Sequence, residues 1–253
     1  MSFKRSRIIE AACLCNVGAK RSNNEDNYYF AGKFMNQEHL NLEAPVTMNE
    51  NLTGDLFFAV FDGMGGGDYG EVASYVASSS VDELFEINPY DVTPSLEKLC
   101  LGLNNKVFSE SEKMDSYAMG TTMASLFFHE GYFWNCNIGD SKCYKMEDDE
   151  LVQLSVDHVD IYDRMHRKPI LTQYLGIDPE TVQIEPYVCS ETFSKGDVFL
   201  ICSDGLTDMV DESFIRDTLV SGSSPEECVS RLVDLALENG GEDNITVIVT
   251  RIG

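Results

Sequence analysis

The sequence predicts one α+β domain over residues 1–253, in which sheets are covered by helices. Two observations predict it. Short apolar runs that end at glycine or at polar residues, typical of strands, alternate with two pairs of helix-periodic segments, and the chain closes on a strand. No linker, low-complexity tract or internal repeat divides the 253 residues, and 43% of them are hydrophobic, which is enough for a sizeable core.

In the N-terminal half we expect strands followed by a pair of helices. Ile8 to Val17 and the apolar run Leu56 to Phe61 predict strands. Residues 31–54 are polar and irregular, so we expect a loop there. Helical spacing covers Gly70 to Glu86, and a second helix is expected from Thr93, as its cap, to Phe108.

The second half repeats this order. An antiparallel meander is expected from Gly120 to Leu154, because short strand-like runs follow one another across turns. The remaining expected elements are strands at Val182 to Val188 and Val198 to Cys202, helices at residues 211–220 and 225–239, and a last strand at Asn244 to Ile252.

The charge of the chain excludes two classes of partner. It has 43 acidic and 18 basic residues and a formal net charge of −25. Such a chain repels nucleic-acid phosphates and anionic membrane surfaces, so we expect neither as a direct partner. In addition, no run approaches the roughly 20 apolar residues that a membrane span needs.

The eight cysteines form no C-x-x-C pair and only four histidines are present, so the spacing supports no zinc site. Cys136 and Cys202 lie in apolar strand runs, where a free cysteine packs as a small hydrophobic residue. The basic N-terminus precedes a short apolar segment that Glu10 interrupts, and we expect a strand there rather than a signal peptide. Cysteines used in this way indicate a reducing compartment, so we expect a cytoplasmic protein.

Four aspartates stand at the ends of apolar runs that are far apart in the sequence. They are Asp62 after LFFAVF, Asp140 after FWNCNIG, Asp204 after VFLICS and Asp243 before ITVIV. Because strands pack side by side, their ends can converge, and close carboxylates repel one another unless cations lie among them. Gly63 also leaves its backbone open to close approach by a ligand.

Oxygen-only ligands of this kind favour Mg²⁺ or Mn²⁺ over zinc or copper. Two such ions about 3.5–4 Å apart would lower the pKa of a bridging water and so create a hydroxide nucleophile near neutral pH. The sequence therefore predicts a two-metal site at one edge of the strands.

Each of these signals also has a simpler interpretation. An Asp-Gly pair alone is most often a turn, and Arg21 alone is most often a solvated surface arginine. Gly65 to Gly70 fits the G-x-G-x-x-G dinucleotide signature, but the parallel β-α-β alternation that this signature requires is missing. An EF-hand fails because its positions 3 and 12, counted from Asp62, are Met64 and Ala73.

Nine motifs in register resemble the metal-dependent serine/threonine protein phosphatases of the PPM (PP2C) family, bacterial branch, over residues 8–250. They are Arg21-x-x-Asn24-Glu25-Asp26, Phe61-Asp62-Gly63-Met64-Gly65-Gly66, Gly70-Glu71-Val72-Ala73-Ser74, Gly120-Thr121-Thr122, Asn137-Ile138-Gly139-Asp140-Ser141, Asp157-His158, Leu175-Gly176, Ser203-Asp204-Gly205-Leu206 and Glu242-Asp243-Asn244. Any one of them is weak evidence, and nine in order are strong evidence.

The resemblance implies a β-sandwich of two antiparallel sheets flanked by pairs of helices, with the metals at one edge. It also implies hydrolysis of phosphoserine and phosphothreonine in phosphoproteins, without a phospho-enzyme intermediate. We expect a monomer. By this resemblance, Asp62 would bridge two Mn²⁺ or Mg²⁺ ions, the Gly63 carbonyl would bind one of them, and Asp204 and Asp243 would complete the site of the other. Asp140 would help to hold a third, weaker metal. Glu25 and Asp26 would hold metal-bound waters, and Arg21 would clamp the phosphate.

Two departures from the family pattern matter. Met64 stands where eukaryotic members carry a histidine that is a candidate general acid, so we assign no general acid. The flap segment, about residues 159–174, is shorter than is usual. Its basic residues could favour acidic substrates or simply be solvated; they are Arg164, His166, Arg167 and Lys168.

Two rival functions stay open on the sequence alone. One is a catalytically inactive binding module, which the intact Asp62, Asp204, Asp243 and Arg21 disfavour. The other is a metal-dependent hydrolase of small phosphate esters. The sequence does not name the physiological substrate.

Overall fold

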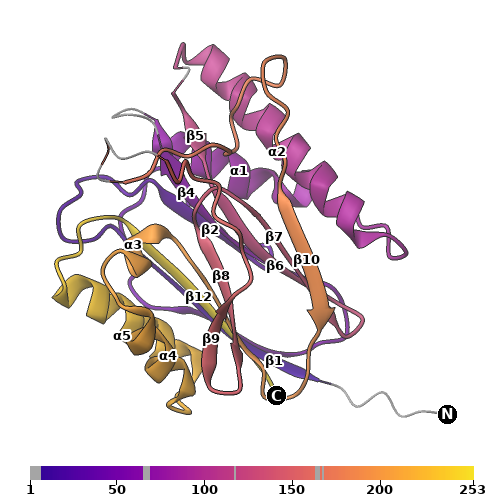
Figure 1. The fold of residues 1–253 in the computed structure, drawn as a ribbon, viewed down its shortest axis with the longest axis vertical. Helices are drawn as coiled ribbons and strands as arrows, with labels where there is room; N and C mark the ends of the chain where they lie inside the picture. Colours follow the sequence, from indigo (N-terminus) through magenta and orange to yellow (C-terminus); the bar gives the residue numbers. More distant parts are fainter. Residues whose placement is uncertain (1–6, 65–68, 117, 163–165, 167) are drawn as a thin grey trace.

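The computed structural model describes residues 7–64, 69–116, 118–162, 166 and 168–253. Two antiparallel sheets lie face to face, and helices cover the outer face of each, as Figure 1 shows. This α-β-β-α arrangement confirms the fold class predicted from the sequence. Gly65 to Asp68, which are part of the G-x-G-x-x-G match, lie outside the described residues, as do the flap residues Arg164 and Arg167.

The first sheet has six strands. They are β1 (Ile8–Asn16), β3 (Val46–Asn51), β8 (Lys142–Glu147), β9 (Glu150–Gln153), β11 (Val198–Cys202) and β12 (Ile245–Ile252). Their order is β3-β1-β12-β11-β8-β9, so the first and last strands of the chain are neighbours at its centre.

The second sheet is built from the middle of the chain. Its strands are β2 (Asp26–Phe30), β4 (Leu56–Met64), β5 (Gly120–Thr121), β6 (Met123–His129), β7 (Tyr132–Ile138) and β10 (Tyr187–Thr192). The order is β10-β7-β6-β4-β2, and the short β5 pairs with the end of β4.

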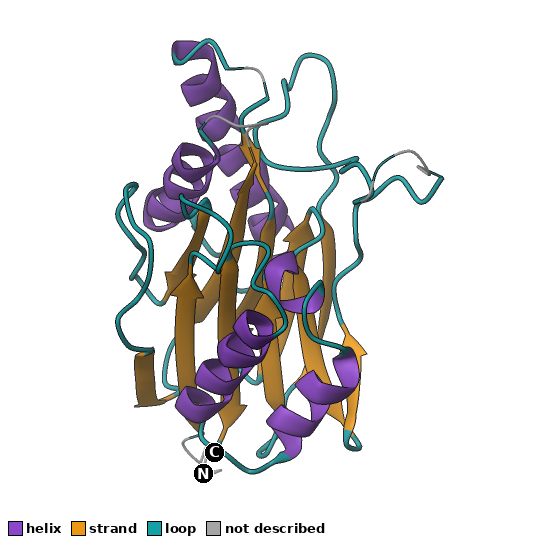
Figure 2. Cartoon of the chain, turned by 90° about the vertical axis from the view of Figure 1, so that its left-hand side faces the viewer, coloured by secondary structure: helices purple, strands orange, loops and turns teal. Residues whose placement is uncertain are grey.

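Five helices complete the part of the fold that the structure describes. They are α1 (Gly70–Leu84), α2 (Val92–Lys113), α3 (Asp204–Thr207), α4 (Glu212–Val220) and α5 (Pro225–Glu238). Helix α5 begins at Pro225, where the sequence predicts a helix to start, and a capping box between Ser224 and Glu227 closes its N-terminus. Figure 2 shows the helices lying over the strands.

Apolar side chains fill three layers between these elements. One buried cluster lies under α1 and α2, one lies under the C-terminal helices, and the third lies between the sheets. The strands near the centre are therefore buried on both faces, and they show continuous apolar runs such as Val198–Cys202, all five of whose residues are buried. The aspartates of the candidate site lie at or near the ends of these strands.

Two strands of the structure differ from the prediction. Residues 46–51, expected to be loop, form β3, and the strand expected at Val182 to Val188 lies instead at Tyr187–Thr192 as β10. Both are edge strands with no fully buried residue. Because an edge strand needs neither apolar alternation nor a buried run, the apolar pattern did not reveal it.

Two helices also differ. Helix α2 starts at Val92 after Asp91, so Thr93 lies inside it rather than at its cap. The helix also continues past Phe108 to Lys113, and Ser111 is still buried in this last part. The single turn α3, which begins at Asp204, was not expected. No helix in the described residues is long and apolar enough to cross a membrane.

Candidate metal centre

Five aspartates reach one edge of the sandwich from both sheets. Asp26 begins β2 and lies opposite Asp62 of β4 in the strand register. Asp140 lies between β7 and β8, Asp204 follows β11, and Asp243 precedes β12. Burial, followed by the charges of the other four aspartates, raises the pKa of Asp62 well above its usual range. The structure thus brings together the strand-end carboxylates that the sequence singled out.

Asp26 is the most deeply buried of these groups, with 1% of its surface exposed. Its Oδ2 accepts hydrogen bonds from Ser203 Oγ and Thr246 Oγ1, both at 2.7 Å, whereas its Oδ1 has no partner among the described residues. Burial raises the pKa of Asp26 to about 7, although the two hydroxyl donors oppose the shift. A buried carboxylate that has one oxygen without a hydrogen-bond partner is suited to a further ligand such as a water or a cation.

The glycines after Asp62 and Asp204 are required by close packing rather than by turn geometry. Neither Gly63 nor Gly205 has a positive φ. A Cβ on Gly63 would lie 2.2 Å from the carbonyl oxygen of Gly70, and a Cβ on Gly205 would lie 1.9 Å from that of Asn244. Both Asp-Gly pairs therefore lie where another backbone segment crosses, so the interpretation of these pairs as ordinary turns is wrong.

Asn244 fixes the loop that carries Arg21 and Glu25. Its side-chain amide donates to the carbonyls of Val17 at 2.9 Å and Asn23 at 3.0 Å, and its Oδ1 accepts from Glu25 N at 2.8 Å. Burial, and then repulsion by other acids, raises the pKa of Glu25. This loop is thereby held next to the start of β12.

Arg21 extends from the same loop towards the carboxylates. Its guanidinium donates to Asp243 Oδ2 at 2.9 Å, and half of its side chain remains exposed to solvent. Because the fork has five N–H donors, the exposed part can still bind a second anion.

A histidine supports the turn that carries Asp140. Gly139 N donates to His158 Nδ1 at 3.1 Å, and His158 N donates to the Gly139 carbonyl at 3.0 Å. Partial burial lowers the pKa of His158, in keeping with a neutral ring that accepts at Nδ1. The pKa of Asp140 is raised to about 6 by burial and then by the charge of Asp204.

Lys168 of the flap brings a cation into the cluster. Its Nζ lies 2.7 Å from Asp204 Oδ2, 2.9 Å from Asp208 Oδ2 and 3.1 Å from Asp243 Oδ2. Although partial burial opposes it, the charge of Asp204 and its hydrogen bond raise the pKa of Lys168. A basic residue in a polar loop is usually solvated, but Lys168 forms ion pairs with three carboxylates.

Within the described residues, no three acidic, histidine or cysteine side chains are arranged to hold a metal ion as they stand. The donor set nevertheless fits a hard divalent cation. The converging ligand atoms are carboxylate oxygens, Asp26 Oδ1 is buried with no partner in the described chain, and the Lys168 ammonium marks a position at which Asp204 and Asp243 hold a cation together.

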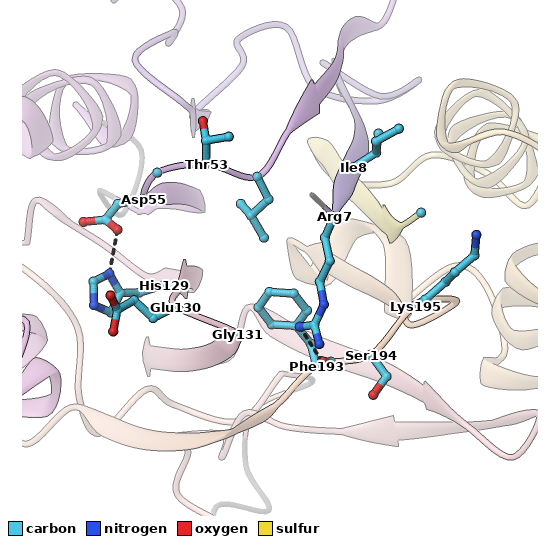
Figure 3. A pocket seen from close by; sticks show the side chains of 13 residues that line it. Arg7, Ile8, Thr53, Asp55, His129, Glu130, Gly131, Phe193, Ser194 and Lys195 are labelled. Atoms are coloured by element: carbon cyan, nitrogen blue, oxygen red, sulfur yellow. Dashed lines mark hydrogen bonds and ion pairs between the residues drawn. The ribbon is translucent and has the colours of Figure 1, made fainter. Parts of the chain in front are cut away.

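A separate cavity of about 990 Å³ lies away from these carboxylates, and Figure 3 shows its lining. Arg7 donates to the Phe193 carbonyl at 2.8 Å with its guanidinium over the Phe193 ring, and His129 pairs with Asp55 at 2.6 Å. The lining residues that the structure describes include none of the predicted site residues. The size of this cavity therefore does not make it the candidate active site.

Comparison with known proteins agrees with the geometry. A family model described as "Protein phosphatase 2C" matches residues 46–235. The chain is 31% identical over 252 residues to the "Serine/threonine phosphatase stp" of Listeria welshimeri, an alignment that covers 92% of this chain and 91% of that protein.

Two further similarities extend over nearly the whole chain. The "Serine/threonine protein phosphatase PstP" of Mycobacterium tuberculosis is 28% identical over 258 residues, which cover 97% of this chain but 45% of PstP, so the chain spans about half the length of that relative. The solved catalytic domain of PstP in complex with two manganese ions superposes with a TM-score of 0.75 at 27% identity, covering 98% of this chain and 99% of that one. Because the family model alone matches more than half of its residues, the chain belongs to the protein phosphatase 2C family.

Proposed function

We propose that this chain is a metal-dependent serine/threonine protein phosphatase, with two Mn²⁺ or Mg²⁺ ions at the five-aspartate edge of the sandwich and a third, weaker ion near Asp140. The observation that carries the proposal is the convergence of strand-end carboxylates from both sheets on Asp62. Family membership and the PstP structure with two manganese ions support the same chemistry.

The proposed ligands are the Asp62 carboxylate and the Gly63 carbonyl, with Asp204 and Asp243 from the other sheet. When bound, the ions would supply an activated water and neutralise charge on the phosphate. Glu25 and Asp26 would accept hydrogen bonds from metal-bound waters and so hold them in place, and Asp26 is positioned for this by Ser203 and Thr246 through its other oxygen. We assign no general acid.

Arg21 would orient the phosphate of the substrate, because a guanidinium fork matches two phosphate oxygens. If this contact is equal in the ground and transition states, Arg21→Ala should raise KM about tenfold with a change in kcat of less than about threefold. Steady-state kinetics on a phosphothreonine peptide measure both. Arg216→Ala, which removes an exposed arginine paired with Asp217, is the matched control. An unchanged KM in Arg21→Ala would remove this residue from the site.

The proposed function is tested by assaying the metal-stripped chain on a phosphothreonine peptide and on an aryl phosphate, with and without Mn²⁺ or Mg²⁺. We expect hydrolysis of the peptide with either ion and a loss of at least about a hundredfold in kcat/KM with chelator, because the carboxylates alone cannot activate water. Hydrolysis of the aryl phosphate alone would instead indicate a hydrolase of small esters. Peptide binding without turnover would indicate an inactive binding module.

A further inference from the structure

We propose that Lys168 is a built-in competitor of the divalent cation: its ammonium holds Asp204 and Asp243 in the metal-free protein and must leave before the metal binds. Lys168 would thereby set the metal concentration at which the enzyme loads. This inference rests on the proposed function, since it takes Asp204 and Asp243 as metal ligands.

The contacts of Lys168 support competition rather than ordinary surface pairing. Its ammonium lies within 3.1 Å of three carboxylates that come from two segments: Asp204 and Asp208 flank the α3 turn, and Asp243 precedes β12. The Asp204 and Asp243 side chains are 16% and 22% exposed, so both are largely withdrawn from solvent. Arg21 donates to the same Asp243 Oδ2, which leaves little room for a further cation there.

The segment that follows Lys168 is held by backbone hydrogen bonds. Pro169 follows it, and a residue before proline is confined to extended conformations. One residue further on, the Ile170 carbonyl accepts from Asp160 N at 2.8 Å, and Thr172 N donates to the His158 carbonyl at 2.8 Å. These bonds tie the segment that follows Lys168 to the backbone of the same histidine that supports the turn of Asp140.

Competition follows because a lysine ammonium and a divalent cation need the same carboxylate oxygens. Metal binding must therefore break the ion pairs of Lys168 with Asp204 and Asp243, and the apparent affinity falls by the cost of breaking them. The coupling is reciprocal, so the metal in turn expels the lysine. We expect a glutamine at position 168, which has no charge to lose, to lower the Kd for Mn²⁺ by about tenfold, equivalent to about 1.4 kcal/mol.

The test is isothermal titration calorimetry of the chelator-treated protein with Mn²⁺. The expected result is a Kd at least fivefold lower in Lys168→Gln than in the wild type, and a Kd within fivefold of the wild type in Lys168→Arg, which keeps the cation. Lys106→Gln is the matched control, because Lys106 pairs with Glu83 on the helical face and its loss changes net charge equally. Its Kd should stay at the wild-type value.

A Lys168→Gln Kd within fivefold of the wild type would overturn the inference, as would an equally tight Lys168→Arg. Asp204→Asn separates the two proposals. If this variant loses Mn²⁺ affinity, the proposed metal site stands whatever Lys168 does. If it binds Mn²⁺ like the wild type, the proposed metal site fails, and the inference fails with it.

Melting temperatures give a second readout that a merely structural lysine would not produce. With chelator, Lys168→Gln should melt below the wild type, because Asp204 and Asp208 lose the lysine ammonium and Asp243 keeps only Arg21 as its counter-ion. With saturating Mn²⁺, the variant should melt at least as high as the wild type, because tighter binding adds to stability. An equal loss under both conditions would assign Lys168 to the fold and overturn the inference.

Discussion

Asp62→Asn is expected to lower kcat/KM on a phosphothreonine peptide by at least about a thousandfold, equivalent to about 4 kcal/mol of transition-state stabilisation. Asp62 is the group on which the charges of the other four site aspartates act, so it lies at the centre of the cluster. An amide of the same shape keeps the volume but removes the charge that would bind the metals, and a metal-assisted reaction depends on that charge.

The same substitution should stabilise the metal-free protein. Because burial and repulsion raise the pKa of Asp62, the folded state binds this proton more tightly than the unfolded chain does. Above the ordinary pKa of an aspartate the unfolded chain has released this proton, so the buried Asp62 carboxyl costs stability there, and the cost is relieved as the pH falls towards that ordinary value. Asp62→Asn removes this cost at neutral pH, and we expect a melting temperature higher by about 2 °C or more in chelator.

Activity and melting temperature together make the prediction for Asp62 specific. A variant that was inactive because it was misfolded would melt lower, whereas the expected variant melts higher and is inactive. Asp234→Asn, on the exposed face of α5, removes one charge far from the cluster and should change neither property. Near-normal kcat/KM in Asp62→Asn would mean that the reaction takes place elsewhere in the chain.

Much of the fold and part of the site could be predicted because they depend on local pattern. Central strands such as β11 are buried on both faces, so they appear as uninterrupted apolar runs with clear ends. An aspartate directly after such a run lies near the end of a central strand, which is why Asp62 and Asp204 were identified. The family resemblance then supplied Arg21, Glu25 and Asp26, whose individual sequence signals are weak. The edge strands β3 and β10 lack this pattern and were missed or misplaced.

Contacts between distant segments could not be predicted. Thr246 and Ser203 bind Asp26 across 220 and 177 residues, and a hydroxyl in a strand carries no sign of such a partner. The ion pairs of Lys168 were equally hidden, because a basic residue in a polar loop is usually solvated. Its position depends on the flap base, whose hydrogen bonds join residues around His158 to residues around Ile170. These interactions arise from tertiary structure alone.

Gly63→Ala is expected to lower the stability of the fold strongly. The new Cβ would lie 2.2 Å from the carbonyl oxygen of Gly70 and 2.4 Å from that of Glu25. Both obstacles are backbone atoms, so neither can rotate away as a side chain could. Because the first residue of α1 and the Glu25 loop must shift together, we expect a loss of about 3 kcal/mol or more in the free energy of unfolding. The melting temperature should then fall by roughly 6 °C or more.

Gly54→Ala is the matched control, because Gly54 has no positive φ and no atom of the described residues lies within 4 Å of the position that the new methyl group would occupy. It should change the melting temperature little, or raise it slightly by restricting the unfolded chain. Calorimetry in chelator measures both variants without any contribution from bound metal. If Gly63→Ala melted within about 2 °C of the wild type, the backbone crossing at Asp62 would not be rigid. Asp62 would then lack the fixed position that a preorganised metal ligand needs, since Gly63 N also bonds to the Glu25 carbonyl at this crossing.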